Sequence, residues 1–296
     1  MQFEGVFPAS TTPFREDRSV DLPALEGHLS WLVREGCAGV VLLGSVGEGG
    51  TLEEDEKLAV LAAGTRTLGG KAPVVSAVSG LSTRTMATFA QRAERAGVDG
   101  LMLLPPYVYR GDEREVEAHF DTLLSATALP CLLYNHPTLY GTDVVPDRVV
   151  ALADRHRNLA GVKDSSPDPG RVPALVRRLG ERLPVLVGSD DLVLAGARGG
   201  ARGWVSGVAN ALPALSVRLW ERSCGRSGPA PEPLYSWFLP LLKLDTVPKF
   251  VQALKLLQAE VGRGSPRVRP PRLPLEGAEL AETRGRIREV LDTPPP

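Results

Sequence analysis

The sequence predicts an α/β protein, a closed (β/α)8 TIM barrel with a C-terminal all-helical extension. About eight short apolar runs of strand length follow one another, stretches with helical spacing of apolar residues lie between them, and strand-like runs stop after Ala211. Such a succession of βα units is typical of a closed barrel. A doubly wound open sheet usually carries a glycine fingerprint after its first strand, whereas here the first strand runs into Thr11–Phe14.

The expected strands are short runs bounded by turn residues. They are Val6–Ser10, Gly39–Leu43, Val74–Ala77, Gly100–Leu104, Cys131–Tyr134, Ala160–Lys163, Val185–Val187 and Gly203–Ser206. A weak internal repeat supports the barrel, because Gly36, Gly97 and Gly200 each precede one of these strands. Glycine at such a place ends the preceding helix and permits a tight entry into the sheet.

Amphipathic stretches between the strands are expected to form the outer helices. They are Asp21–Arg34, Glu53–Leu68, Ser82–Ala96, Glu113–Thr127 and Pro173–Leu179, and Thr51 and Ser82 are suited to cap helix starts. Helical patterns then continue through Leu212–Arg222, Leu234–Leu244, Pro248–Val261 and Ala278–Leu291. Because Gly225–Pro233 is rich in proline and glycine, we expect residues 1–224 to form the barrel with the active site and residues 225–296 a C-terminal helical domain.

Composition argues against several classes of function. The chain of 296 residues is 43% hydrophobic and has 34 Lys and Arg against 35 Asp and Glu, so it has no long-range attraction for nucleic acid. No apolar run approaches the roughly 20 residues that cross a bilayer, and no basic segment with an apolar stretch of signal-peptide length opens the chain. The three cysteines are far apart and the four histidines have no metal-ligand spacing. We therefore expect a cytoplasmic protein without a metal, a nucleic-acid partner or membrane contact.

Lys163 is the first candidate for the chemistry. It ends the run Leu159–Lys163, and catalytic groups of such barrels lie at the carboxyl ends of the strands. Burial there disfavours the charged ammonium and leaves free amine that attacks a ketone. A solvated lysine at a strand end is the alternative, and the position of Lys163 alone does not exclude it.

Two further segments end neighbouring strands. Tyr134 closes the strand before Lys163 and offers a phenol that passes protons, although a barrel tyrosine bonded to the backbone is the commoner case. The segment Gly44–Glu48 offers flexible backbone whose amides converge on a carboxylate, and Ser45 adds a hydroxyl. Glu48 has an equally plausible structural role, accepting backbone hydrogen bonds within the loop.

Together these segments resemble the dihydrodipicolinate synthase/N-acetylneuraminate lyase family of Schiff-base class I aldolases, over nearly the whole chain. The matching segments are Gly44–Glu48 for the family's Gly-Ser/Thr-x-Gly-Glu turn, Tyr134–Pro137 followed by Gly141 for its Tyr-Asn-x-Pro segment, and Gly161–Asp164 for its lysine strand.

The resemblance implies roles for these residues. Lys163 would form an imine with pyruvate or a longer 2-oxo acid, so that no other cofactor is needed, and Tyr134 would shuttle protons with the Ser45 hydroxyl. The turn at Ser45, Val46 and Gly47 would hold the carboxylate of the 2-oxo acid. The resemblance also suggests a homotetramer in which a tyrosine near Tyr107 reaches a neighbouring active site.

Three departures narrow the substrate. Leu139 stands where the synthases usually carry an arginine that binds the carboxylate of the second substrate. Val108 replaces the second tyrosine of the synthase Pro-Tyr-Tyr pattern, which leaves Tyr107 or Tyr109 to complete a proton relay. Val46 replaces a second hydroxyl residue and offers only a backbone amide.

The remaining expected substrate-binding residues follow later strands. Gly188, Asp190 and Asp191 resemble the acidic segment with which the lyases contact substrate hydroxyls, while helix capping is an equally open role for the two aspartates. Val205, on the last strand, and Tyr107 complete the set.

We therefore expect a metal-independent lyase or aldolase, or a dehydratase, that acts on a 2-keto-3-deoxy sugar acid or a hydroxy-2-oxo acid. The named alternative is dihydrodipicolinate synthase, which condenses pyruvate with aspartate semialdehyde. A non-catalytic 2-oxo-acid-binding homologue and a metal-dependent barrel aldolase are alternatives of other classes.

Overall fold

Eight parallel strands form a barrel in the computed structural model, which describes residues 1–296. The strands are β1 (Gly5–Pro8), β2 (Val40–Leu42), β3 (Val74–Val78), β4 (Gly100–Leu103), β5 (Cys131–Asn135), β6 (Leu159–Asp164), β7 (Val185–Val187) and β8 (Gly203–Ser206). They pair in the order β1-β8-β7-β6-β5-β4-β3-β2. The Ala38 N–H donates to Val6 O (2.8 Å) and the Ser10 N–H to Val41 O (2.8 Å), which joins β1 to β2 and closes the barrel. The predicted fold is confirmed.

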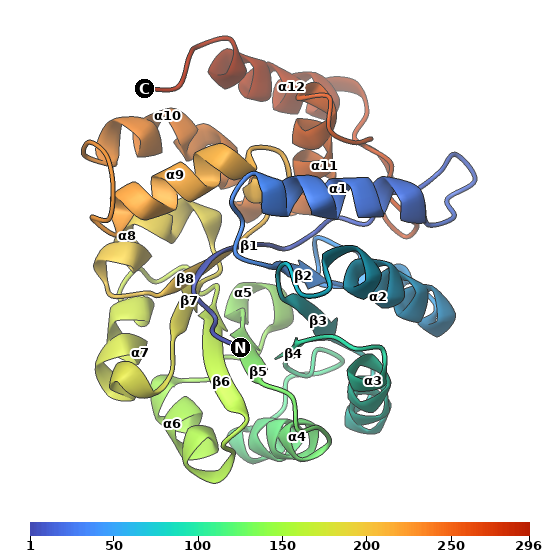
Figure 1. The fold of residues 1–296 in the computed structure, drawn as a ribbon, viewed down its shortest axis with the longest axis vertical. Coiled ribbons are helices and arrows are strands. Elements are labelled where there is room, and N and C mark those ends of the chain that lie inside the picture. Colours follow the sequence, from blue (N-terminus) through green and yellow to red (C-terminus); the bar gives the residue numbers. More distant parts are fainter.

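Helices surround the barrel in a ring (Figure 1). Those of the ring are α1 (Leu22–Arg34), α2 (Glu54–Leu68), α3 (Thr83–Arg95), α4 (Glu113–Ser125), α6 (Pro146–Arg155), α7 (Arg171–Leu179), α8 (Val193–Arg198) and α9 (Pro213–Ser223). A one-turn helix, α5 (Pro137–Tyr140), lies between β5 and α6. The C-terminal helices α10 (Glu232–Leu242), α11 (Phe250–Glu260) and α12 (Gly277–Leu291) gather on one side of the ring (Figure 1).

Local sequence explains where several helices begin. Asp21 accepts a hydrogen bond from the Ala24 N–H (3.1 Å) at the start of α1, and Ser82 caps α3 as predicted. The prediction that Thr51 caps a helix is wrong. Thr51 ends a single 3-10 turn, and Glu53 is the N-cap of α2, because the Glu56 carboxylate reaches back to the Glu53 N–H (2.9 Å).

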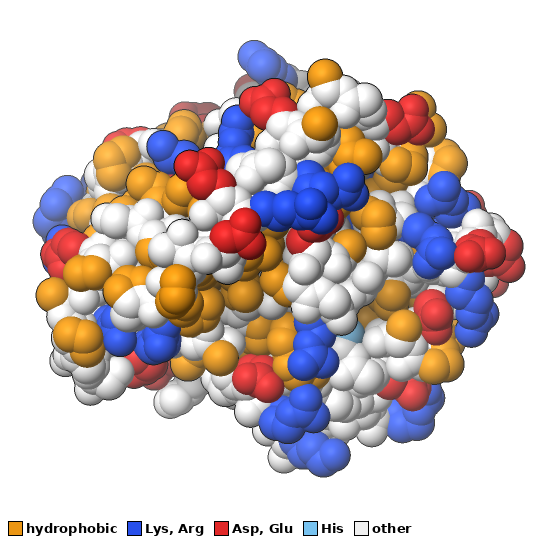
Figure 2. Space-filling model, turned by 90° about the horizontal axis from the view of Figure 1, so that it is seen from above, with side chains coloured by type: hydrophobic (Ala, Val, Ile, Leu, Met, Phe, Trp, Pro, Cys, Tyr) orange, Lys and Arg blue, Asp and Glu red, His pale blue; other side chains and the backbone are white.

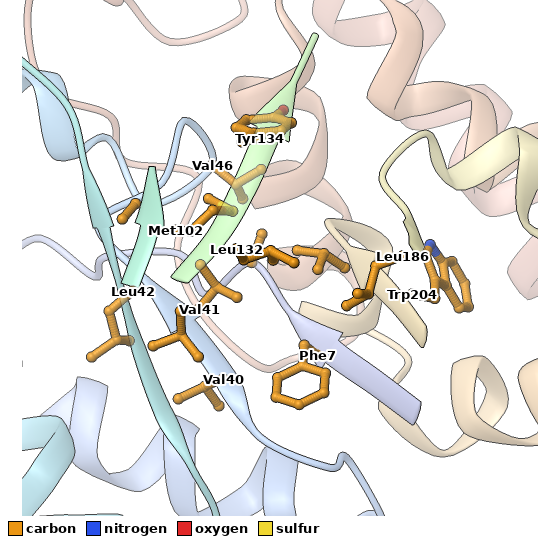
Figure 3. Packing of buried hydrophobic residues seen from close by; sticks show 14 of the residues in the cluster. Phe7, Val40, Val41, Leu42, Val46, Met102, Leu132, Tyr134, Leu186 and Trp204 are labelled. Carbon is orange, nitrogen blue, oxygen red and sulfur yellow. The ribbon is translucent and has the colours of Figure 1, made fainter. Parts of the chain in front are cut away.

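Apolar side chains fill the barrel interior and continue without a break into the C-terminal helices. Figure 3 shows Val41, Leu132 and Leu186 inside the barrel, with Tyr134 at one end of the group. All three aliphatic side chains are at most 1% exposed. The same apolar cluster contains Leu241 of α10 and Ile287 of α12, so these helices are fixed to the barrel by the hydrophobic effect.

The surface is mixed in charge. Figure 2 shows basic and acidic side chains interspersed over one face of the molecule. Many of them pair between neighbouring helices, as Arg155 does with Asp121 (3.1 Å). Exposed pairs of this kind contribute about 0–1 kcal/mol each, so the apolar core carries most of the stability. No helix is long and apolar enough to cross a membrane.

Candidate active site

A cavity of about 440 Å³ opens at the carboxyl ends of the strands. Side chains from five strands or the residues that follow them line it: Ala9, Met102, Tyr134, Lys163 and Val205. Alternate residues of a strand point to the same face, so Leu132 lies in the barrel interior below Tyr134, and Tyr134 faces the cavity. Strands β5 and β6 pair Tyr134 directly with Lys163, which brings the phenol and the amine together at the mouth.

Lys163 lines the cavity although almost none of the residue is exposed to solvent. Its side chain is buried, and the Nζ lies 3.9 Å from the centroid of the Tyr134 ring. Burial lowers the pKa of Lys163 to about 8, although the carboxylates of Asp245 and Asp190 oppose the shift. About a tenth of the amine is then unprotonated at pH 7, roughly 300 times more than for an ordinary lysine. Lys163 is therefore equipped to act as a nucleophile near neutral pH.

Gly188 at the end of β7 makes room for this lysine. A Cβ at Gly188 would lie 2.7 Å from Lys163 Cε and 2.0 Å from Ser165 Oγ. No side chain fits there unless both residues move, so the glycine is a steric requirement of the site.

The hydroxyls of Tyr134 and Ser165 lie close together beside Lys163. Burial, its largest cause, raises the pKa of Tyr134 well above 10, while the nearby Ser165 hydroxyl opposes the shift. The Ser165 Oγ is buried and has no partner with hydrogen-bond geometry. A buried hydroxyl without a partner costs free energy unless a ligand satisfies it. Tyr134 and Ser165 thus offer two groups to a bound substrate.

The turn that follows β2 is strained and tightly packed. Leu43 and Glu48 both have positive φ values, 62° and 55°, which cost non-glycine residues roughly 1–3 kcal/mol each. Between them, a Cβ at Gly47 would lie 2.7 Å from Ser10 O. Such a conformation persists only when its surroundings hold it, and it places Ser45 and Val46 on the cavity wall.

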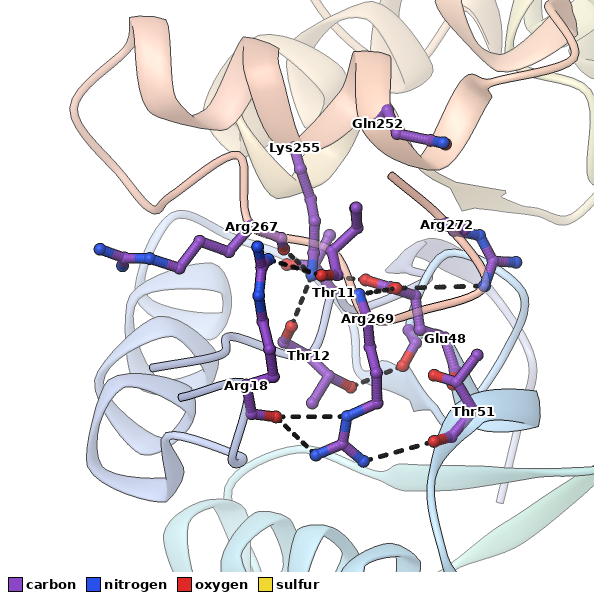
Figure 4. Close-up of polar contacts among 12 residues, drawn as sticks. Thr11, Thr12, Arg18, Glu48, Thr51, Gln252, Lys255, Arg267, Arg269 and Arg272 are labelled. Atoms are coloured by element: carbon purple, nitrogen blue, oxygen red, sulfur yellow. Dashed lines mark hydrogen bonds and ion pairs between the residues drawn. The ribbon is translucent and has the colours of Figure 1, made fainter. Parts of the chain in front are cut away.

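A buried ion pair between Glu48 and Lys255 holds the turn in this conformation (Figure 4). Glu48 Oε1 lies 2.5 Å from the Nζ of Lys255 on α11, and Oε2 accepts from the Arg269 N–H (2.9 Å). Lys255 also donates to the carbonyl oxygens of Thr12 (2.8 Å) and Arg267 (2.7 Å). Both ionic side chains are at most 2% exposed. The C-terminal helices therefore fix the turn that carries Ser45.

The Ser45 hydroxyl has a hydrogen-bond partner outside the turn. Its Oγ lies 2.5 Å from the hydroxyl of Tyr140, the last residue of α5. The Tyr140 ring meets the Tyr134 ring edge-on, with 5.7 Å between centroids.

Part of the cavity wall is acidic. Asp191 follows β7, and Asp245 comes from the 3-10 turn Lys243–Thr246 between α10 and α11. Burial raises the pKa of Asp245 to about 6, and Lys163 opposes the shift. Asp190 lies outside the cavity: its buried carboxylate accepts from the Trp204 indole (2.9 Å) and from the Gly207 and Val208 N–H groups (3.1 and 2.8 Å).

The predicted site residues thus divide into two groups. Lys163, Tyr134, Ser45, Val46, Leu139, Gly188, Asp191 and Val205 line the one cavity. Gly47, Tyr107 and Asp190 do not line it. Gly47 packs against the backbone of Ser10, and Asp190 accepts hydrogen bonds from β8 and the residues after it. Tyr107 lines a second cavity beside the first.

Sequence reasoning missed several residues that the structure brings to the cavity or its rim. Asp245, Ser165 and His136 line it, and Tyr140 bonds to Ser45. Burial, then the charge of Lys163, lowers the pKa of His136 to about 4, so its ring is neutral at pH 7. The signals for two of them were present, since Tyr140 lies inside the tyrosine segment and Asp245 interrupts an apolar run. No three His, Cys, Asp or Glu side chains converge in a way that would hold a metal ion.

Comparison with known proteins gives a consistent result. The model of the dihydrodipicolinate synthetase family matches residues 2–290. A 4-hydroxy-tetrahydrodipicolinate synthase of Macrococcus caseolyticus is 30% identical over 295 residues, 99% of each chain. Two solved structures superpose closely. One is a putative dihydrodipicolinate synthetase from Pseudomonas aeruginosa (28% identity, TM-score 0.91, 98% of this chain and 100% of that one). The other is YagE from E. coli K12, a member of the same family in complex with pyruvate (26% identity, TM-score 0.89, 98% and 99%). The chain belongs to the dihydrodipicolinate synthetase family.

Proposed function

We propose that the chain is an imine-forming lyase or aldolase, or a dehydratase, whose substrate is a 2-oxo acid with a hydroxylated, uncharged tail. The observation that carries the proposal is Lys163, a buried amine with a pKa of about 8 that faces a cavity beside Tyr134 and the Ser45 turn. The relative that is solved with pyruvate supports a small 2-oxo acid as the ligand.

The chemistry follows from the groups around the cavity. The Lys163 amine adds to the C2 ketone, and loss of water gives a protonated imine that withdraws electrons. In a cleavage reaction the C3–C4 bond then breaks, its electrons form an enamine, and the proton of the C4 hydroxyl leaves as the aldehyde forms. Tyr134 is the nearest phenol to accept that proton and return it to C3. Hydrolysis of the new imine releases pyruvate and regenerates the lysine.

The acidic wall selects the tail of the substrate. Asp191 and Asp245 offer acceptors to hydroxyl groups and repel a second carboxylate. Leu139, 43% exposed at the mouth, supplies no cation to offset that repulsion. Thr138, Ser189 and Thr246 add further polar groups. A 2-keto-3-deoxy sugar acid or a hydroxy-2-oxo acid fits this lining better than aspartate semialdehyde does.

The alternative is the synthase activity named for the relatives, condensation of pyruvate with aspartate semialdehyde. A direct comparison tests the two. Purified protein is assayed for pyruvate release from a panel of hydroxylated 2-oxo acids and for condensation of pyruvate with aspartate semialdehyde. We expect the larger kcat/KM for a hydroxylated substrate. Larger synthase activity would overturn the assignment of the tail.

Variants sharpen the comparison. Asp245→Asn should reduce kcat/KM for the preferred hydroxylated substrate and should raise it for an analogue whose tail ends in a carboxylate. If wild-type protein binds pyruvate covalently but turns over no member of the panel and makes no condensation product, the non-catalytic homologue is the better account. Loss of activity with a chelator would favour a metal-dependent aldolase.

A further inference from the structure

Ser45 lines both the substrate cavity and a second cavity, and Tyr140 contacts Ser45 from the second one. The second cavity, about 790 Å³, is lined by Ser45, Tyr107, Tyr140 and Arg272, among others, whereas the first contains Ser45 but not Tyr140. The Ser45 hydroxyl therefore has the substrate cavity on one side and the Tyr140 hydroxyl, 2.5 Å away, on the other.

The local fold sets Tyr140 in this place. His136 caps the single turn of α5, the Tyr140 N–H donates to His136 O (3.0 Å), and Gly141 ends the turn with a φ of 71°. Only glycine adopts that conformation without cost. The turn folds the Tyr140 ring back between Tyr134 and Tyr107, with centroid distances of 5.7 and 5.9 Å.

No other tyrosine of the chain is placed to do the same. Tyr107 contacts Tyr140 rather than Ser45, and the Tyr109 side chain is 57% exposed. Val108, which lies between these two tyrosines in the sequence, offers no hydroxyl and is also 57% exposed.

We propose that Tyr140 of the same chain completes the proton path of the imine site, by relaying protons between Ser45 and the second cavity. Ser45 accepts a proton on its Oγ from the substrate side and passes its own to the Tyr140 oxygen, which releases its proton into the second cavity. In total, one proton moves from the substrate cavity to the second cavity, and neither hydroxyl is left charged. Tyr140 is a positioning residue in this scheme, because it acts on the substrate through Ser45.

The charge environment suits this role. Burial raises the pKa of Tyr140 to about 12, and the Ser45 hydrogen bond and Arg272 oppose the shift. The phenol stays neutral at pH 7, so it both donates and accepts. Lys163, Tyr134, Ser45 and Tyr140 all come from one chain, so the proposed path uses no residue of a neighbouring subunit.

Exchange of the pyruvate methyl protons in D2O tests the inference, which rests on the proposed function. The exchange breaks a C3–H bond of the imine to give the enamine and returns a deuteron from solvent. We expect Tyr140→Phe to trap pyruvate on Lys163 with borohydride as wild type does, but to exchange about 10²-fold more slowly, the lower end of what a positioned acid or base contributes. Thr122→Val, which removes an exposed hydroxyl on α4 that lines neither cavity, should exchange at the wild-type rate.

The outcomes separate the two claims. No adduct in wild-type protein refutes the proposed function, whereas a trapped adduct with exchange in Tyr140→Phe within twofold of wild type refutes the relay alone. In addition, Ser45→Ala and the double variant Ser45→Ala/Tyr140→Phe should be equally slow, since residues that act as a unit are not additive. Additive losses would contradict the path.

Two further measurements remove a purely structural explanation. Fluorotyrosine at position 140 keeps the ring and lowers the pKa of the phenol, so the alkaline limb of the exchange profile should move to lower pH. An unmoved profile would overturn the relay even if Tyr140→Phe fails to fold. Mixed assemblies of Lys163→Ala and Tyr140→Phe chains should not regain exchange, and regained exchange would show that Tyr140 acts on a neighbouring subunit.

Discussion

Replacing Lys255 by methionine should destabilise the protein and loosen the site at the same time. Glu48 and Lys255 are at most 2% exposed and lie 2.5 Å apart. Without the ammonium, the Glu48 carboxylate keeps only the Arg269 N–H and, at 4.0 Å, Arg272. Removing one partner of a buried pair costs about 3–5 kcal/mol, because the other charge is left uncompensated.

The change in melting temperature follows from the length of the chain. The entropy of unfolding is about 2.1 cal/mol/K per residue, so 296 residues give roughly 0.6 kcal/mol/K. A loss of about 3–5 kcal/mol in the free energy of unfolding then corresponds to a decrease of about 5–8 °C in the melting temperature, measured by circular dichroism. The Ser45 turn rests on Glu48, so the KM for the 2-oxo acid should rise as well.

Two variants control this experiment. Lys71→Met removes an exposed lysine that forms no ion pair and should change the free energy of unfolding by less than about 0.5 kcal/mol. Lys255→Met/Glu48→Gln removes both charges and should recover part of the loss. If Lys255→Met melts within about 1 °C of wild type, the pair does not hold the turn.

Three other predictions concern the cavity. First, the rate of pyruvate trapping should rise about tenfold per pH unit well below pH 8 and level off above it, because only the neutral amine attacks and the pKa of Lys163 is about 8; a rate that still rises at pH 10 would contradict the lowered pKa. Second, Gly188→Ala should cut kcat by at least about 10²-fold, since the new Cβ displaces Lys163 and Ser165. Gly27→Ala, a helix position with nothing within 4 Å of the new Cβ, should keep full activity, and equal activity of the two variants would refute the steric argument. Third, Leu139→Arg should raise kcat/KM for a substrate with a carboxylate tail, tested by the aspartate-semialdehyde assay; an unchanged ratio of the two activities would mean that the mouth does not select the tail.

The strands that carry Lys163 and Tyr134 were predictable because burial on both faces leaves an unmistakable apolar run. All eight expected strands are present, with ends within two residues of those predicted. Helices α5, α6 and α8 were not anticipated. Two of them are short, with four residues in α5 and six in α8, and α5 is a single turn that depends on its cap and on Gly141 rather than on a periodic pattern. Helix α6 has ten residues, and its amphipathic pattern was not recognised.

Parts of the site that depend on tertiary contacts were not predictable. Asp190 and Asp191 are neighbours in the sequence, yet the first is buried against Trp204 and the second faces the cavity. Asp245 approaches Lys163 only because the C-terminal helices fold over the barrel mouth. The division of the chain after residue 224, the substrate-binding roles and the homotetramer stay predictions.

The most direct test of the central claim is borohydride reduction of the protein in the presence of pyruvate, followed by mass analysis of its peptides. The account predicts one stable adduct, on the peptide that contains Lys163, and none in Lys163→Ala, which should also be inactive. An adduct on another residue, or full activity in Lys163→Ala, would contradict it.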